Sequence, residues 1–528
     1  MASTNTNSSS QMDPNSGFCS HTKIFHSLRP SFSLPPPSQL LSATQFTLSL
    51  LHSTTTNFSE TPFLINEVTG HSITYSDFLH QIKSLAFSLK KQYSVSKGDV
   101  AFILSPYSLQ IPSLYLSLLS LGVVIAPANP DDSISELTHQ IQLTRPTIVF
   151  ATSDTSHKLP PNVRIILIDS QEFSSLLTQY NNLDSIGSDV VVNQSDIAAI
   201  VYSSGTTGRN KGVLLSHGNL IARVAAFRAN DPFETGVKVQ RVSLIRRPLF
   251  GSYRLLYMMK AASMGGTLVL SETSESEALF KAVQNYKLNY CVVPPSFIVS
   301  VVKSELTKYD LSSLKFVMSC GAPLGTEVIE NFKEKFPNVE ILDAYGLTEA
   351  GPVAAMRFPD EINKLGSVGR LVEVVEAKIV DLLTGELLSP GQRGELWVRG
   401  PSTMKGYVGD EKATAETIDS EGWLKTGDLC FFDSDGFLFI VDRLKDMIKY
   451  HGYQVPPAEL EHLLLSNTAI ADAAVVPYPD EEAGQIPMAF VVEPNKKIQR
   501  IAFVDFIPKS AAGKILRREL VNRAISDP

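Results

Sequence analysis

The feature that most restricts the fold is an alternation of helix-like and strand-like segments that begins near Ser72. Short apolar runs at 99–105, 164–169 and 197–202 are typical of buried strands, and helix-like stretches lie between them. This alternation predicts βαβ units around parallel sheets. Because ligand sites in such sheets lie at the carboxyl ends of the strands, the loops after these runs are the first candidates for function.

The length and the later pattern indicate more than one domain. A chain of 528 residues is too long for one ordinary hydrophobic core. Residues 366–409 are rich in glycine and β-branched residues, which predicts antiparallel strands or a small barrel. Beyond Arg443 a new amphipathic helix and strand indicate a small C-terminal domain. The polar residues 1–22 are predicted to be a disordered tail.

Charge and composition argue against several classes of partner. The net charge is −8 and no long basic run is present, so nucleic acid and anionic membranes are poor candidates. The longest apolar stretch, 114–128, is too short for a membrane span. The four cysteines lie far apart and match neither a disulfide framework nor a zinc site. We therefore expect small-molecule partners, no membrane span and a monomer.

The expected location is the cytoplasm. The N-terminal residues lack the basic and apolar regions of a signal peptide. The peroxisome is the alternative, although the sequence ends Ile-Ser-Asp-Pro and not Ser-Lys-Leu.

The stretch SSGTTGRNKG, from Ser203 to Gly212, directly follows an apolar strand. Glycine lets backbone N–H groups approach an anion closely, and Lys211 adds a positive charge. The glycine and lysine spacing differs from that of the P-loop. Taken alone, the stretch predicts an anion-binding loop, and a flexible polar hairpin fits it as well.

Four further stretches carry polar groups suited to a bound nucleotide. Thr348 and Glu349 follow another strand and offer a hydroxyl and a carboxylate to a metal-bound phosphate. Asp428 follows a tight turn, where a carboxylate can accept from ribose hydroxyls. Arg443 with nearby lysines, and Lys514 before a basic helix, complete the set. Each has a structural alternative, a helix first-turn acid for Glu349 and a solvated basic face for the cations.

In this order, the five stretches resemble the adenylate-forming superfamily of acyl-CoA synthetases, firefly luciferase and nonribosomal peptide adenylation domains. The stretches FHSLRPSFSLPP, YSSGTTGRNKGVLLSHGNL, YGLTEAGPV and GWLKTGDL bring the chain closest to plant 4-coumarate–CoA ligase-like proteins. The resemblance implies an α/β fold: a large N-terminal domain, 23–441, of two doubly wound sheets plus a small β-barrel, and a small α+β C-terminal domain, 442–528. It also implies ATP, Mg²⁺ and coenzyme A as cofactors.

The implied reaction has two steps. A carboxylate attacks the α-phosphate of Mg·ATP and gives an acyl-adenylate and pyrophosphate. The thiol of coenzyme A then displaces AMP. Catalysis of this kind needs mainly positioning and charge stabilisation.

The resemblance assigns roles to residues at matching positions. Those assigned to the β- and γ-phosphates are Ser203, Ser204, Gly205, Thr206, Thr207 and Lys211. Those assigned to adenine are Gly321, Ala322, Pro323, Asp343, Ala344 and Tyr345. Thr348 would meet the α-phosphate, Glu349 the Mg²⁺, and Asp428 with Arg443 the ribose. Arg209-Asn210 replaces the usual Leu-Pro of the phosphate loop, and ATP binding is expected to survive this change.

The C-terminal domain is expected to turn about Asp442 between the two steps. Lys514 would bridge the carboxylate and the α-phosphate in the first step. The residues that would face the adenylate and coenzyme A after the turn are Lys445, Lys449, His451, Gly452 and Gln454. Lys514, Lys449, Gln454 and Thr348 form the implied catalytic set.

The acyl pocket that the resemblance implies comes from distant segments: Tyr253, Tyr257, Met318, Gly321, Gly346, Pro352, Val353 and Met356. Met318 stands where the family has a lysine, which removes a donor to a phenolic oxygen. A flexible thioether suits an aliphatic chain. The expected acid is therefore either hydroxycinnamate-like or a medium- to long-chain fatty acid of jasmonate-precursor type. Of these two classes, the fatty acid is the one we favour.

One departure concerns the C-terminal domain. Asn495 is followed at once by KKIQRIAF, so the domain is shortened near 493–497 and is predicted to lack a helix. A missing helix exposes the apolar face that it covered. Two alternatives to the ligase therefore stay open: an adenylation-only enzyme of luciferase type, and an adenylation-impaired isoform that acts as an acyl- or nucleotide-binding protein.

Overall fold

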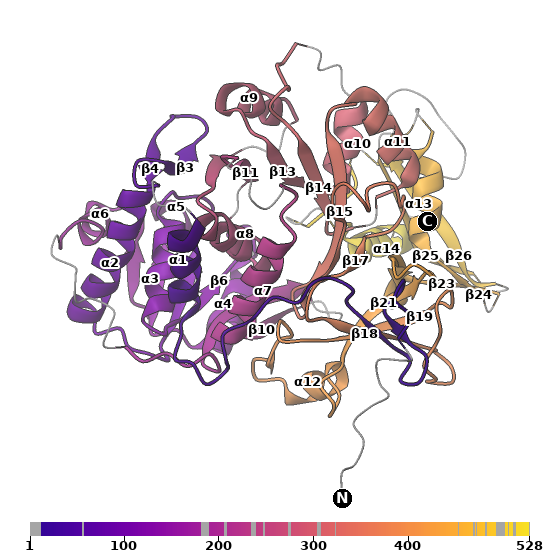
Figure 1. The fold of residues 1–528 in the computed structure, drawn as a ribbon, viewed down its shortest axis with the longest axis horizontal. Coiled ribbons are helices and arrows are strands. Elements are labelled where there is room, and N and C mark those ends of the chain that lie inside the picture. Colours follow the sequence, from indigo (N-terminus) through magenta and orange to yellow (C-terminus); the bar gives the residue numbers. More distant parts are fainter. Residues whose placement is uncertain are drawn as a thin grey trace, which may run out of the picture.

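The computed structural model describes most of the chain. The described residues are 12–54, 58–180, 190–204, 209–233, 239–246, 249–272, 276–303, 308–322, 324–451, 453–467, 470, 472–480, 483–492, 502–504, 506–510 and 514–526. They form four sheets with helices packed on them (Figure 1). The α/β class predicted from the alternation is confirmed.

The first sheet has seven strands in the order β20-β10-β9-β6-β5-β7-β8. Its strands are β5 (Val100–Leu104), β6 (Val124–Pro127), β7 (Ile148–Ala151), β8 (Ile165–Leu167), β9 (Ile197–Ser204), β10 (Asn210–Ser216) and β20 (Gly406–Tyr407). The strands from β9 to β8 pair in parallel, whereas β10 pairs antiparallel with both β9 and β20. Its helices are α2 (Tyr75–Gln92), α3 (Ile111–Ser120), α4 (Ile134–Thr144), α5 (Ser153–Ser156) and α6 (Gln171–Leu176).

Helix α2 shows how the local sequence sets these elements. Thr74 and Asp77 form a capping box at its start, which satisfies two otherwise unpaired backbone N–H groups. Ile82, Leu85 and Leu89 are buried on one face, as their spacing predicts.

The second sheet has nine strands in the order β17-β16-β15-β14-β13-β11-β12-β3-β4. Its strands are β3 (Pro62–Asn66), β4 (Ser72–Thr74), β11 (Val242–Arg246), β12 (Thr267–Ser271), β13 (Tyr290–Val293), β14 (Phe316–Cys320), β15 (Glu340–Leu347), β16 (Gly351–Ala355) and β17 (Arg370–Leu371). The helices near it are α1 (Ala43–Thr54), α7 (His217–Ala229), α8 (Ser252–Ser263), α9 (Ser276–Tyr286), α10 (Pro295–Lys303) and α11 (Thr326–Lys335).

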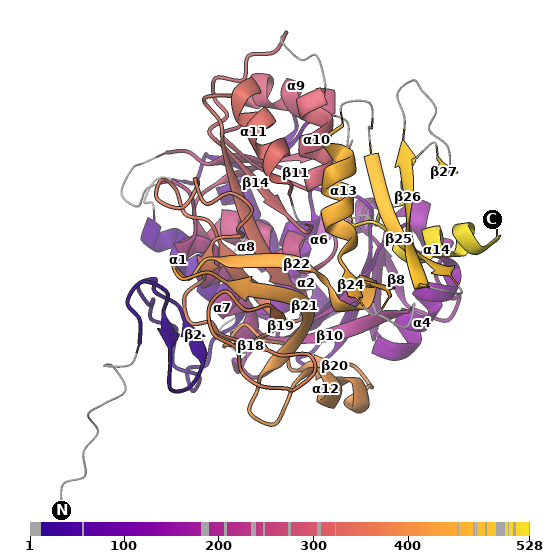
Figure 2. The same cartoon turned by 90° about the vertical axis from the view of Figure 1, so that its right-hand side faces the viewer.

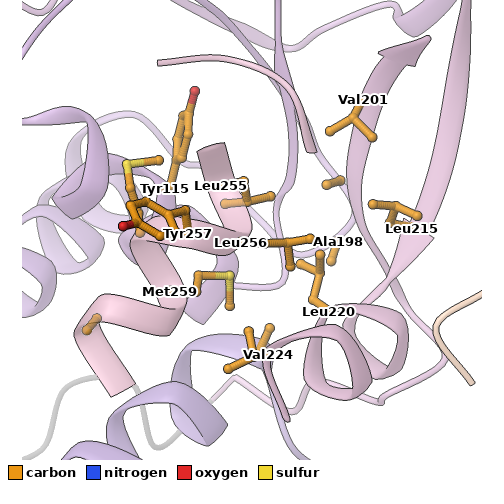
Figure 3. Packing of buried hydrophobic residues seen from close by; sticks show 14 of the residues in the cluster. Tyr115, Ala198, Val201, Leu215, Leu220, Val224, Leu255, Leu256, Tyr257 and Met259 are labelled. Atoms are coloured by element: carbon orange, nitrogen blue, oxygen red, sulfur yellow. The ribbon is translucent and has the colours of Figure 1, made fainter. Parts of the chain in front are cut away.

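Helices α7 and α8 lie in the largest hydrophobic core, which draws residues from both of these sheets. Figure 3 shows Leu256 of α8 beside Leu220 of α7 and the strand residue Ala198, and Met259 of α8 near Val224 of α7. A core shared in this way fixes the two sheets relative to each other, so the loops at their strand ends are held on rigid supports.

The third sheet has six strands in the order β1-β2-β18-β19-β21-β22, with antiparallel pairing. Its strands are β1 (Phe18–Cys19), β2 (Ile24–His26), β18 (Glu376–Val380), β19 (Gly394–Arg399), β21 (Leu424–Phe432) and β22 (Leu438–Arg443), and α12 (Glu411–Thr417) lies beside it. It stands where antiparallel strands or a small barrel were predicted. Phe18 and Cys19 are each 8% exposed, so the expected disordered tail does not extend to residue 22.

The C-terminal part forms a separate sheet, which lies to the right in Figure 2. Its elements are β23 (Ile448–Tyr450), β24 (Tyr453–Val455), α13 (Pro457–Leu465), β25 (Asp472–Asp480), β26 (Gly484–Val492), β27 (Ala502–Phe503) and α14 (Arg517–Ser526). Ala474, Val476, Phe490, Ile507 and Leu520 form its core. The predicted shortening at 493–497 lies outside the described residues.

A buried ion pair joins two segments on either side of that region. Arg517 donates to both carboxylate oxygens of Glu461 at 2.7 Å, and the N–H of Val475 donates to the same carboxylate at 2.8 Å. Burial raises the pKa of Glu461, and Arg517 opposes the rise. The described part of this domain therefore has both a hydrophobic core and a satisfied polar anchor.

None of the helices in the described part of the chain combines the length and the apolar character needed to cross a bilayer. All four cysteines are free, and three of them are buried, as the sequence predicts.

Candidate active site

The first group of predicted residues meets around Asp428. The Tyr345 hydroxyl donates to the Asp428 carboxylate at 2.5 Å, and Arg443 lies 3.4 Å from the same group. The register of β21 and β22 places Asp428 directly opposite Arg443. Burial raises the pKa of Asp428, and the Arg443 guanidinium opposes the rise. Tyr345 of the second sheet therefore contacts the Asp428–Arg443 ion pair of the third sheet, and we call the place where they meet the Asp428 corner.

Lys514 comes to this corner from the C-terminal domain. Burial lowers the pKa of its ammonium, Arg443 lowers it further, and Asp428 and Glu349 raise it. These influences place Lys514 within electrostatic range of three predicted site residues. The Ser510 N–H donates to the Lys514 carbonyl at 2.7 Å, and the Lys514 N–H donates to the Ser510 hydroxyl at 3.2 Å. The segment that carries Lys514 is thus held by its own backbone turn.

The phosphate-loop residues lie in the β9–β10 hairpin. Lys211 pairs with Ser203 across the hairpin, and its ammonium lies 4.8 Å from the centre of the Tyr407 ring. The Tyr407 hydroxyl donates to the Glu349 carboxylate at 3.2 Å. Tyr407 therefore connects the cation of the loop with the predicted metal ligand. Gly205, Thr206 and Thr207 lie outside the described residues, as does the side chain of Ser204.

Arg223 of α7 holds the turn that carries Thr348 and Glu349. Its guanidinium donates to the carbonyls of Thr348 at 3.0 Å and Glu349 at 3.3 Å. It also donates to the Ser402 carbonyl at 2.9 Å and to the Ser252 hydroxyl at 3.0 Å. Burial lowers the pKa of Arg223 to about 9. A fully buried arginine that is bonded mainly to carbonyls acts as a brace for this turn.

The predicted adenine residues lie at the ends of β14 and β15. Gly321 has a φ of 97°, a left-handed conformation that favours glycine, and it is exposed with Ala322. Asp343 is buried, and burial raises the pKa of its carboxyl to about 8, against the Ala344 N–H that donates to it at 2.9 Å. Pro323 lies outside the described residues. The exposed Gly321 and Ala322 therefore follow directly after β14, beside the partly buried strand β15 that carries Asp343.

The predicted acyl residues divide into two groups. Tyr253 and Tyr257 stack with their ring centres 5.6 Å apart and line a cavity. The Tyr290 hydroxyl, next to Tyr257, donates to the Met318 sulfur at 3.2 Å. Val353 and Met356 belong to the same hydrophobic core as Tyr257 and Met318, whereas Gly346 and Pro352 pair across β15 and β16.

The predicted hinge residue Asp442 is buried, and its carboxylate accepts two hydrogen bonds. Its carboxylate accepts the Arg443 N–H at 2.7 Å and the Ala458 N–H at 2.8 Å. Lys449, His451 and Gln454 lie exposed on the β23–β24 hairpin, so the structure does not bring them to Asp428. Lys445, also exposed, lies within electrostatic range of Lys514. Gly452 lies outside the described residues.

Two residues at this site, Arg223 and Tyr407, were not found from the sequence. Arg223 is the charged residue within the apolar run 220–227 of α7, a signal that could have identified it. Tyr407 carried no such signal, because its contacts come from two segments far away in the chain. In the described ranges no cluster of three or more metal-binding side chains occurs.

Known proteins and family models match nearly the whole length of this chain. The family model "AMP-binding enzyme" matches residues 51–408, and the model "AMP-binding enzyme C-terminal domain" matches 459–504. The protein "4-coumarate–CoA ligase-like 9" of Arabidopsis thaliana is 52% identical over 99% of this chain and 98% of its own length. "Peroxisomal OPC-8:0-CoA ligase 1" of the same plant is 39% identical over 97% and 98%.

The first of these alignments also bears on the length of the chain. It extends over 554 positions, whereas this chain has 528 residues. The relative therefore contains residues that have no counterpart here.

Solved structures show the same fold. ATP-bound MatB from Rhodopseudomonas palustris superimposes with a TM-score of 0.80 at 21% identity, covering 92% of this chain and 99% of that one. The o-succinylbenzoate CoA synthetase of Bacillus subtilis, in complex with its acyl-adenylate intermediate, has a TM-score of 0.76 at 26% identity and covers 89% and 97%.

Proposed function

Because the chain belongs to the AMP-binding enzyme family, we propose that it is an ATP-dependent, AMP-forming acid–CoA ligase. An oxygen of the acid attacks the α-phosphorus of ATP, and pyrophosphate leaves. The sulfur of coenzyme A then attacks the acyl carbon, the thiol proton is lost, and AMP leaves. The observation that carries the proposal is Lys514, which reaches from the C-terminal domain to within electrostatic range of Asp428 and Glu349.

The positions of the residues suit the first step. A cation near Asp428 and Arg443 stabilises the charge that develops when the carboxylate attacks a phosphate. Lys211 would hold the outer phosphates, which leave as pyrophosphate. The Asp428–Arg443 pair would hold the ribose, with Tyr345 fixing the carboxylate.

The residues around Glu349 fit a magnesium ion. Mg²⁺ usually binds through one or two carboxylates together with substrate phosphates and water. Glu349 is half-buried, and among the described residues only the Tyr407 hydroxyl donates a hydrogen bond to its carboxylate. One carboxylate beside a phosphate loop matches that donor set. When bound, the ion would neutralise phosphate charge.

The second step would use the exposed β23–β24 hairpin. Lys449, His451 and Gln454 lie on it, away from Asp428 in this structure. A turn of the C-terminal domain about Asp442 would replace Lys514 by this hairpin. The two hydrogen bonds of the Asp442 carboxylate would then have to break or follow the turn.

We propose a hydroxycinnamate-like or a medium- to long-chain fatty acid of jasmonate-precursor type as the substrate. Tyr253, Tyr257 and the Tyr290–Met318 contact support a pocket for an aromatic or flexible apolar body. The names of the relatives, a 4-coumarate–CoA ligase-like protein and an OPC-8:0-CoA ligase, support the same two classes. A cytoplasmic location, with the peroxisome as the alternative, and a monomeric state stay predictions.

The decisive experiment measures ATP–pyrophosphate exchange by the purified chain over a panel of cinnamates and medium- to long-chain acids, and then AMP release with and without coenzyme A. A ligase exchanges pyrophosphate and releases AMP faster when coenzyme A is present. Exchange without an effect of coenzyme A would indicate an adenylation-only enzyme. ATP binding without exchange would indicate the adenylation-impaired isoform.

The contact between Tyr407 and Glu349 gives a mild and specific prediction. Tyr407→Phe keeps the ring under Lys211 but loses the hydrogen bond to the carboxylate, so the KM for Mg·ATP is expected to rise about tenfold. Tyr407→Leu loses both contacts and is expected to raise it further. Steady-state titration of ATP measures both values, and an unchanged KM in Tyr407→Phe would remove Tyr407 from the phosphate site.

A further inference from the structure

A cavity beside the predicted acyl residues contains two arginines. It is bounded by the end of β11, the first turns of α8, the end of β13 and Cys320, and it is partly open to solvent. Arg246, the last residue of β11, and Arg254, in the first turn of α8, both line it together with Tyr253 and Tyr257. Two guanidinium groups are unusual in a pocket for a purely apolar chain.

In the part of the chain that the structure describes, Arg254 forms no salt bridge with an Asp or Glu side chain. Burial lowers the pKa of both Arg254 and Arg246, and Arg254 lowers that of Arg246 further. A cation that is partly removed from water, as Arg254 is, costs free energy unless an anion joins it. The buried hydroxyl of Tyr253 also finds no hydrogen-bond partner among the described residues.

A neighbouring cavity serves as an internal comparison. It shares Tyr257 as a wall, and its two cations, Arg241 and Lys260, are both paired with Asp231, at 2.8 and 3.0 Å. The charges in that second cavity are therefore satisfied within the protein. Because Tyr257 separates the two spaces, it also limits how far a substrate can extend.

The first cavity lies next to the predicted adenine segment. Cys320, the last residue of β14, lines the cavity, and Gly321 and Ala322 follow it directly in the chain. Burial raises the pKa of the Cys320 thiol, and Arg254 and Lys514 oppose the rise. A molecule bound in the cavity would therefore extend past Cys320 towards the predicted nucleotide site. The outer phosphates of ATP are expected elsewhere, beside Lys211 and Glu349.

Resting on the proposed ligase function, we propose that the preferred acid carries a second carboxylate, at the end away from the reacting one, and that Arg254 binds this group in the cavity. Arg254 supplies two parallel N–H donors, a geometry that suits a carboxylate. The Tyr253 hydroxyl supplies a third donor and Arg246 adds positive charge. The substrate is thus an α,ω-dicarboxylic acid of medium length, with its apolar body against the tyrosine rings.

The test compares matched acids on the full chain. ATP–pyrophosphate exchange is measured with the monocarboxylates from hexanoate to dodecanoate and with the dicarboxylates from hexanedioate to dodecanedioate. At the best length, kcat/KM for the dicarboxylate is expected to exceed that for the matched monocarboxylate by about 10- to 100-fold. Arg254→Met is expected to remove this preference, and Arg254→Lys to retain part of it, because it keeps the charge but not the paired donors.

The control is Arg164→Met, which removes an exposed arginine stacked on Tyr93 in the first sheet, far from the site, and should leave the preference intact. Monocarboxylates turned over as well as dicarboxylates by the unchanged protein would overturn this inference and leave the ligase standing. An equal loss for both acid series in Arg254→Met would also overturn it, since it would assign Arg254 to the reacting carboxylate. Exchange with no acid at all would overturn the ligase and this inference together.

Discussion

Replacing Lys514 with alanine is expected to lower ATP–pyrophosphate exchange by about 10²–10³-fold, the cost of removing one preorganised charge from a transition state. Lys514 is the cation that the C-terminal domain brings to Asp428 and Glu349. The variant should still bind ATP, because Lys211, Tyr407 and the Asp428–Arg443 pair are unchanged. The loss is therefore expected in kcat and not in the KM for ATP.

A second measurement separates this role from a structural one. When acyl-adenylate is supplied in place of ATP and acid, the Lys514→Ala variant should form the thioester at nearly the normal rate, because the second step is proposed to use the β23–β24 hairpin. Arg518→Ala is the matched control, since Arg518 is an exposed cation in α14 close to Lys514 in the chain. An exchange rate for Lys514→Ala within about threefold of normal would refute the assignment. An equal loss in both half-reactions would indicate damage to the domain instead.

Replacing Arg223 with methionine is expected to have the largest effect on stability. The change removes the donors from three carbonyls and one hydroxyl, at Thr348, Glu349, Ser402 and Ser252. Buried acceptors left without a partner cost about 1–3 kcal/mol each, so a loss of about 3 kcal/mol or more in the free energy of unfolding is expected. Chemical denaturation measures it.

Arg223 should also position the turn that it bonds. After correction for the folded fraction, Arg223→Met is expected to need a higher Mg²⁺ concentration for half-maximal exchange, because the backbone of Glu349 is no longer held. Arg228→Met is the control on the same helix. Arg228 donates to the Ser263 carbonyl, and its loss should cost about 1 kcal/mol without a change in Mg²⁺ dependence. An unchanged Mg²⁺ requirement in Arg223→Met would make Arg223 purely structural.

The described part of the C-terminal domain has a hydrophobic core and a buried ion pair. The prediction of a missing helix rests on residues 493–497, which lie outside the described part of the chain. Around that gap, the core of Val476, Phe490 and Leu520 and the Arg517–Glu461 pair connect the strands with α14. These contacts explain how Lys514 reaches the site although the chain is shorter than its relative. The exchange assay decides whether it is active there.

Some features follow from the sequence alone. The alternation of apolar runs determined the parallel sheets, because hydrophobic periodicity is a local property of the chain. The motifs around Ser203, Thr348, Asp428, Arg443 and Lys514 are continuous in the chain, so their resemblance to the adenylate-forming superfamily could be read from the sequence, and that resemblance implied a nucleotide and a carboxylate. The first of these motifs begins at the end of strand β9, Ile197–Ser204, where ligand sites of parallel sheets are expected.

Only the tertiary structure decided which side chains meet. Tyr407 joins Lys211 to Glu349, Arg223 joins α7 to a turn more than a hundred residues later, and Arg254 faces a cavity with Arg246. These contacts depend on how two sheets pack around a shared core, and no local pattern encodes that distance. The same reason explains why only Tyr253 and Tyr257 of the predicted acyl residues line the cavity. A pocket built from separate strands takes its shape and charge from packing, so the acid is decided there.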